Sequence, residues 1–168
     1  MSEKISFHQD TALGQVLSRW WKGLDKNRGP RAELRRAHDL TAVALTSAYQ
    51  HFYRQMVVAG WVSSASDDWQ NERLTAIAGL LAHVTSEDAR TLPHAMSDGD
   101  QPAFSELRFR RLLESQTIDE AFISLRRAIP MIGDKANIHQ LATDVLYWGD
   151  NVKKRWAYDY RWPDKKQS

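Results

Sequence analysis

Basic side chains occur in short clusters along this 168-residue sequence, and their spacing suits the binding of phosphate groups. Arg108, Arg110 and Arg111 lie within four residues of one another. On a helix that turns by about 100° per residue, they fan out on the side away from Phe109, with Arg110 nearest the apolar face. Guanidinium groups that point outward in this way form an anion-binding surface.

Three further clusters repeat this pattern: one in residues 31–36, one at residues 126–127 and one at residues 153–155. A solvated helix face explains any single cluster equally well. Four outward clusters in a chain of net charge +2 favour phosphate binding instead. The charge is also uneven, because residues 19–36 have a marked excess of bases whereas residues 37–103 have a marked excess of acids.

Motifs for catalysis are weak by comparison. The sequence has no cysteine, no His-Glu-x-x-His pair, no Gly-x-Ser-x-Gly turn and no glycine-rich phosphate loop. His38 and Asp39, with His8 and Asp144, loosely match the ligands of helical metal-dependent phosphohydrolases. The same two residues are equally explained if Asp39 caps a helix and His38 lies on the surface, and we favour that interpretation. We therefore expect no catalytic residue, no metal and no cofactor.

The elements that must position the basic clusters are helices, because the hydrophobic period is helical and no alternating strand pattern occurs. We predict an all-α fold of two small helical bundles packed together: an N-terminal lobe over residues 1–84, a loop over 85–103 and a C-terminal lobe over 104–168. The predicted helices cover residues 13–24, 30–37, 39–59, 66–84, 105–113, 118–132 and 138–156. The candidate N-caps are Asp10 or Thr11, Asp39, Ser66 and Ser105.

Seven tryptophans divide by their surroundings. Trp20, Trp148 and Trp156 belong to apolar stripes and are expected in the core, whereas Trp61 and Trp162 are candidates for an interface. No apolar run approaches the roughly 20 residues of a membrane span, and the N-terminus lacks the apolar core of a signal peptide. We therefore expect a soluble cytoplasmic protein.

The ordered motifs resemble one known family, the small subunit (CasB) of the type I-E CRISPR surveillance complex Cascade. The resemblance extends from about Leu13 to Tyr160 and is weakest over residues 61–103. Its motifs are Arg31-Ala-Glu-Leu-Arg-Arg-Ala37, Ser105-Glu-Leu-Arg-Phe-Arg-Arg-Leu-Leu113, Leu125-Arg-Arg-Ala-Ile129, Leu146-Tyr-Trp-Gly149 and Trp156-Ala-Tyr-Asp-Tyr160.

This resemblance implies a non-enzymatic protein that binds guide RNA, target DNA and the displaced DNA strand. It also implies contact with the RNA-coating backbone subunits, the large subunit CasA and a second copy of the chain. We expect the nucleic-acid contacts from Arg31, Arg35, Arg36, Arg108, Arg111, Arg126, Arg127, Lys153 and Lys154, with Arg110 a weaker candidate. Two alternatives stay open: a purely structural protein adaptor, and a metal-dependent phosphohydrolase built around His38 and Asp39.

Overall fold

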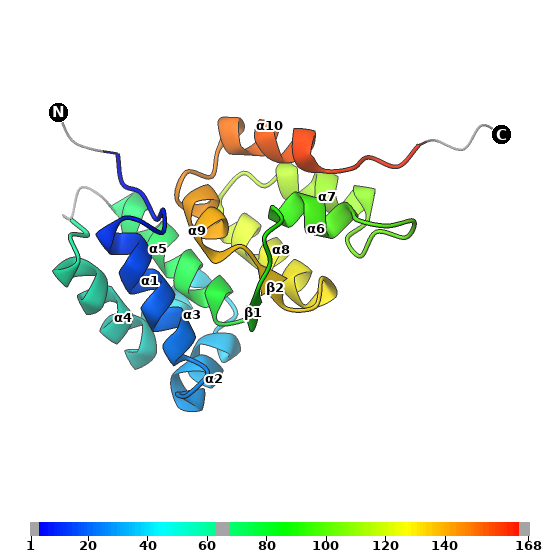
Figure 1. Ribbon diagram of the computed structural model, residues 1–168. Helices are drawn as coiled ribbons and strands as arrows, with labels where there is room; N and C mark the ends of the chain where they lie inside the picture. Colours follow the sequence, from blue (N-terminus) through cyan, green and yellow to red (C-terminus); the bar gives the residue numbers. More distant parts are fainter. Residues whose placement is uncertain (1–3, 63–67, 165–168) are drawn as a thin grey trace.

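The computed structural model describes residues 4–62 and 68–164, whose regular secondary structure is almost entirely helical (Figure 1). The predicted all-α class is confirmed, with one two-residue pair of parallel strands added. The helices are α1 (Ala12–Gly23), α2 (Arg28–Arg36), α3 (Leu40–Ala44), α4 (Ser47–Val58), α5 (Asp68–Leu81), α6 (Leu92–Ser97), α7 (Glu106–Leu113), α8 (Ile118–Met131), α9 (Ile138–Leu146) and α10 (Asp150–Asp159), and the strands are β1 (Ser86–Glu87) and β2 (Lys135–Ala136).

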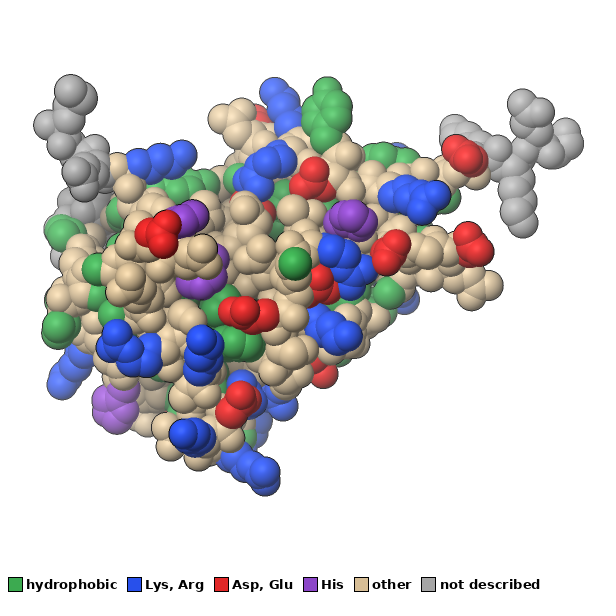
Figure 2. Space-filling view, in the orientation of Figure 1, with side chains coloured by type: hydrophobic (Ala, Val, Ile, Leu, Met, Phe, Trp, Pro, Cys, Tyr) green, Lys and Arg blue, Asp and Glu red, His purple; other side chains and the backbone are tan. Residues whose placement is uncertain are grey.

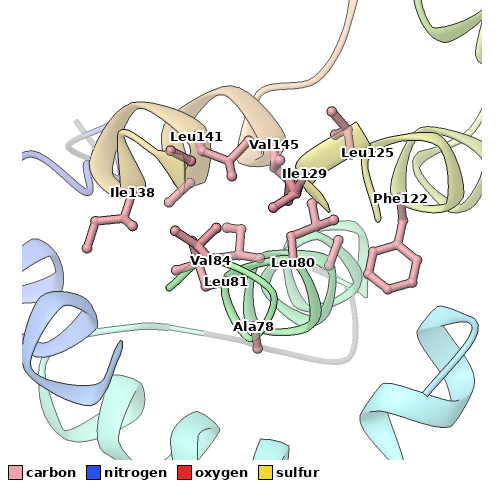
Figure 3. Packing of buried hydrophobic residues seen from close by; sticks show 14 of the residues in the cluster. Ala78, Leu80, Leu81, Val84, Phe122, Leu125, Ile129, Ile138, Leu141 and Val145 are labelled. Carbon is pink, nitrogen blue, oxygen red and sulfur yellow. The ribbon is translucent and has the colours of Figure 1, made fainter. Parts of the chain in front are cut away.

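Helix α5 lies at the centre of the core. Every residue from Leu74 to Leu81 is buried, and α5 packs against α3, α8 and α9. In Figure 3, Leu80 and Leu81 face side chains of α8 and α9, including Ile129 and Val145. A fully buried leucine or isoleucine contributes about 1.5–3 kcal/mol of transfer free energy. The contacts of α5 therefore hold the two halves of the chain against each other.

Local capping explains where most helices begin. The side chains of Thr11, Asp39 and Ser105 each accept a hydrogen bond from a backbone N–H in the first turn of α1, α3 and α7. These three predicted caps are confirmed. Ser66, the fourth, lies outside the described residues. Thr117 caps α8 in the same way, and α8 ends at Met131, directly after Pro130, where the sequence predicts a break.

Two long helices predicted from the sequence are wrong, because each is two shorter helices. The predicted helix over 39–59 breaks at Leu45, which is 81% exposed, and Thr46 caps α4 by accepting from the N–H of Tyr49. The predicted helix over 138–156 breaks between α9 and α10. There, Nη1 of Arg73 donates to the carbonyl oxygens of Leu146 and Trp148 at 3.0 and 2.7 Å. A distant side chain thus satisfies carbonyls that a continuous helix would have used itself.

The segment 85–103, predicted as a loop, contains regular structure. Strand β1 pairs in parallel with β2, with Ser86 opposite Lys135. Helix α6 follows, capped by Thr91, which accepts from the N–H of His94, and with Pro93 in its first turn. The loop prediction missed α6 because the helix has only six residues, too few to show a hydrophobic period. The division of the chain into two lobes at this segment stays a prediction.

The tryptophan predictions are mostly confirmed. Trp148 and Trp156 are buried, and the Trp20 ring lies 4.2 Å from the ring of Phe52. Trp61, predicted at an interface, is only 2% exposed, and its Nε1 donates to Oδ1 of Asn71 at 2.9 Å. That interface prediction is therefore wrong.

Trp162 is 39% exposed and stays an interface candidate. Among residues 4–62 and 68–164, no helix is long and apolar enough to cross a membrane.

Gly14 in α1 has no room for a side chain, because Phe7 and His8 cross directly over it. A Cβ there would lie 2.6 Å from the carbonyl oxygen of Phe7 and would overlap that of His8. We expect Gly14→Ala to lower the free energy of unfolding by about 2 kcal/mol, because the N-terminal segment must move off α1. Gly23→Ala on the same helix is the control, since a Cβ at that position meets nothing within 4 Å. Urea unfolding measures both, and equal losses in the two variants would contradict the prediction.

Candidate nucleic-acid interface

The arginines of α2 and α8 meet at the C-terminal end of α5. Nη2 of Arg126 donates to the carbonyl oxygen of Arg35 at 2.8 Å, across 91 residues of sequence. Nε of Arg35 in turn donates to the carbonyl oxygen of Ala82 at 2.8 Å. Two half-buried guanidinium groups are therefore held in fixed positions by backbone carbonyls.

His83 lies beside these two arginines and responds to them. Burial, followed by the positive charges of Arg126 and Arg35, lowers the pKa of His83 from 6.5 to about 4. At neutral pH the imidazole is therefore uncharged, so the positive charge at this site belongs to the arginines alone.

A second contact joins α8 to α7. Nη1 of Arg108 lies 3.9 Å from Sδ of Met131, and Met131 lies one helical turn after Arg127. Arg108 and Arg111 are three residues apart on α7 and are both exposed, as is Arg127. Contacts with α8 thus link the basic residues of α2 to those of α7, and we refer to Arg35, Arg36, Arg108, Arg111, Arg126 and Arg127 together as the arginine ridge.

Exposure separates the members of the ridge into two kinds. Arg35 and Arg126 are half-buried and bound to backbone, whereas Arg36, Arg111 and Arg127 are exposed. Within the described residues, these three exposed side chains make no hydrogen bond or ion pair. They are free to bind an anionic partner. Arg110, which the sequence placed nearest the apolar face, is exposed as well.

The other predicted site residues lie beside the ridge or away from it. Arg31, one turn before Arg35 on α2, pairs with Asp25 at 2.9 Å, and only 14% of its side chain is exposed. Lys153 donates from Nζ to the carbonyl oxygen of Ser115 at 2.8 Å, while Lys154 is exposed. Both lysines belong to α10, which Figure 1 places on the opposite side of the molecule from α2. Lys153 and Lys154 therefore lie far from α2 but near the C-terminal end of α7, because Ser115 follows α7 by two residues.

The residues of the phosphohydrolase alternative have other roles. Asp39 caps α3, accepting from the N–H of Ala42 at 2.7 Å. The buried carboxylate of Asp144 accepts from Gln140, Arg155 and Trp156. In the part of the chain that the structure describes, no three His, Asp or Glu side chains come together to hold a metal ion. Nothing in this arrangement favours the phosphohydrolase.

Sequence reasoning missed a polar cleft on the face shown in Figure 2. On this face, basic side chains lie near acidic and histidine side chains (Figure 2), and residues of α1, β1 and α9 line the cleft. The cleft has a volume of about 660 Å³, and Arg19 and Lys22 of α1 line one wall. Arg19 and Lys22 follow Gln15 by four and seven residues, so all three lie on one face of α1. This spacing is the feature of the sequence from which one wall of the cleft could have been predicted. The opposite wall could not be foreseen, because it comes from β1 and α9.

Fold and surface together define the class of this protein: a small, mainly helical chain with arginines on outer helix faces. Residues 30–160 match the family of CRISPR-associated protein Cse2, and the chain belongs to that family. No curated protein sequence matches it significantly.

Two solved structures share this fold. A chain of E. coli Cascade bound to a PAM-containing dsDNA target is 19% identical with a TM-score of 0.66, over 87% of this chain and 92% of that chain. CasB from Thermus thermophilus is 23% identical with a TM-score of 0.62, over 86% of this chain and 96% of that chain.

The position of His83 predicts a pH dependence of stability. Between pH 6.5 and pH 4 the unfolded chain binds a proton at His83 that the folded chain does not. Stability is therefore lost as pH falls through this window, by up to about 3 kcal/mol. We expect His83→Gln to make the urea midpoint less sensitive to pH between 7 and 4.5.

His38→Gln, at an exposed histidine, is the matched control for this measurement. If His83→Gln and His38→Gln show the same pH dependence, the assigned environment of His83 is wrong.

Proposed function

We propose that this chain is the non-catalytic small subunit of a type I-E CRISPR surveillance complex, Cascade, and that it acts in the cytoplasm. Its family and the fold it shares with a chain of DNA-bound E. coli Cascade support this proposal. Its partners are then guide RNA, target DNA, the displaced strand, the backbone subunits, the large subunit CasA and a second copy of the chain.

The arginine ridge is the single observation that carries the nucleic-acid role. Guanidinium groups bind phosphate oxygens with two parallel hydrogen bonds, and such contacts position a strand without reading its sequence. In an RNA-guided complex, base pairing with the guide supplies the sequence recognition. The exposed Arg36, Arg108, Arg111 and Arg127 contact the sugar-phosphate backbone, and the half-buried Arg35 and Arg126 add fixed positive charge beside them.

A small number of such contacts is sufficient for this role. Opening a target exchanges a DNA duplex for an RNA–DNA heteroduplex of about equal stability, so modest binding of the products shifts the balance. The ridge stabilises the heteroduplex and the displaced strand in this way. Lys153 and Lys154 of α10 provide a further phosphate contact near α7, at the end of the molecule away from α2.

Salt dependence tests the role of the ridge. Binding of the purified protein to a fluorescein-labelled single-stranded DNA is followed by anisotropy between 50 and 200 mM NaCl. We expect Arg108→Ala with Arg127→Ala to weaken binding and to flatten the slope of log K against log salt by about 1.4, or about 0.7 per lost phosphate contact.

The control removes two positive charges elsewhere, at exposed Arg54 on α4 and exposed Lys26 after α1. Arg54→Ala with Lys26→Ala should keep the wild-type slope. Equal slopes for the two double variants would contradict the ridge and would favour the adaptor, in which the arginines meet acidic protein surfaces.

A further inference from the structure

A polar cleft separates α1 from β1 and from the start of α9. Its volume of about 660 Å³ lies within the usual range of about 300–1,000 Å³ for small-ligand sites. A smaller cavity of about 370 Å³ continues it and shares Gln9, Asn137 and His139 with it. The two together form a groove along the face shown in Figure 2.

One wall of the cleft is cationic. Gln15, Arg19 and Lys22 follow one another along the same face of α1, and all three are exposed. Across residues 4–62 and 68–164, these side chains have no hydrogen bond or ion pair. Their polar groups are therefore available to a ligand.

The opposite wall carries a carboxylate and an amide. Glu87 of β1 is exposed and, among the described residues, forms no ion pair with the α1 wall. The neighbouring Asp88 is bound by Arg90, which lowers its pKa to about 2, so its oxygens are already used. Asn137 accepts with Oδ1 from the N–H of Gln140, and its amide N–H groups donate to no other described residue.

The third side of the cleft is fixed by the N-terminal segment. Nδ1 of His139 lies 2.8 Å from the carbonyl oxygen of Phe7. Because a carbonyl only accepts, this nitrogen donates. Since Phe7 and His8 also rest directly on Gly14, Gln9 is held at the edge of the cleft. This side of the cleft is therefore held in place by contacts within the protein.

We propose that this cleft binds an unpaired nucleotide of a nucleic-acid strand. Arg19 and Lys22 bind its phosphate. Glu87 accepts hydrogen bonds from base N–H groups, for which guanine is best suited because its N1–H and its amino group are adjacent donors. Gln15 and Asn137 bind other base edges. If the cleft bound phosphate alone, the negative charge of Glu87 would weaken binding by repelling the anion. An acidic peptide is disfavoured for the same reason.

This inference rests on the proposed function in taking a nucleic-acid strand as the ligand. It goes beyond that function because the ridge contacts phosphates only, whereas the cleft contacts a base.

Two labelled probes of equal length test the proposal on the full-length protein: a guanine- and cytosine-containing single-stranded DNA, and the same backbone with abasic sites throughout. Both carry the same phosphates, so their affinity ratio isolates base contacts. We expect the wild type to bind the base-containing strand about tenfold more tightly. Gln15→Ala with Glu87→Ala should bring the ratio close to one without weakening binding to the abasic strand.

Gln55→Ala with Glu72→Ala is the matched control, because these residues are the same two types, are exposed and lie outside the cleft. It should keep the wild-type ratio. The ridge variant Arg108→Ala with Arg127→Ala should weaken binding to both probes by the same factor. The affinity ratio therefore tests the cleft even if the ridge does not bind nucleic acid. A wild-type ratio of one, or a ratio that survives Gln15→Ala with Glu87→Ala, overturns the cleft proposal.

Discussion

The C-terminal end of the buried helix α5 is the constraint on which the rest of the structure depends. A buried helix end leaves carbonyl oxygens that must find donors. In the buried turn that directly follows α5, two distant side chains supply such donors: Nε of Arg35 donates to the carbonyl oxygen of Ala82, and Nε1 of Trp21 donates to that of Val84, both at 2.8 Å. Helices α1 and α2 are thus attached to α5 by hydrogen bonds as well as by apolar packing. Removing either donor would leave a buried carbonyl unsatisfied, which costs about 1–3 kcal/mol.

The same constraint creates the centre of the ridge. Because Arg35 must reach Ala82, the last turn of α2 is brought against α8, where Arg126 binds the carbonyl oxygen of Arg35. That end of α2 carries the negative pole of the helix dipole, and Arg126 therefore stabilises it. An arginine can fill a structural and a surface role at once, because some of its five N–H donors can bind a carbonyl oxygen while others stay available to an anion. The Arg126 side chain thus both stabilises the end of α2 and adds positive charge at this site.

The sequence was sufficient for features that depend on local pattern. Helical periods and short polar caps such as Thr11 and Ser105 identify most helices, because their signals lie within one turn. The prediction failed where a contact comes from far along the chain, as when Arg73 satisfies the carbonyls that interrupt the helix predicted over 138–156. The burial of Trp61 is of the same kind, since its partner Phe7 lies in the N-terminal segment.

The basic clusters were found from the sequence, but which of them adjoin was not. The contact of Arg126 with Arg35 spans 91 residues, and no local pattern encodes it. Helix α1 illustrates how one helix serves both the core and the surface. Its buried face attaches Trp21 to α5, and its polar face presents Arg19 to the cleft. Since α5 also holds Arg35, the cleft and the ridge are fixed to one buried helix. The positions of these basic side chains are therefore fixed relative to one another, and a chain of net charge +2 concentrates its positive charge by placement rather than by total charge.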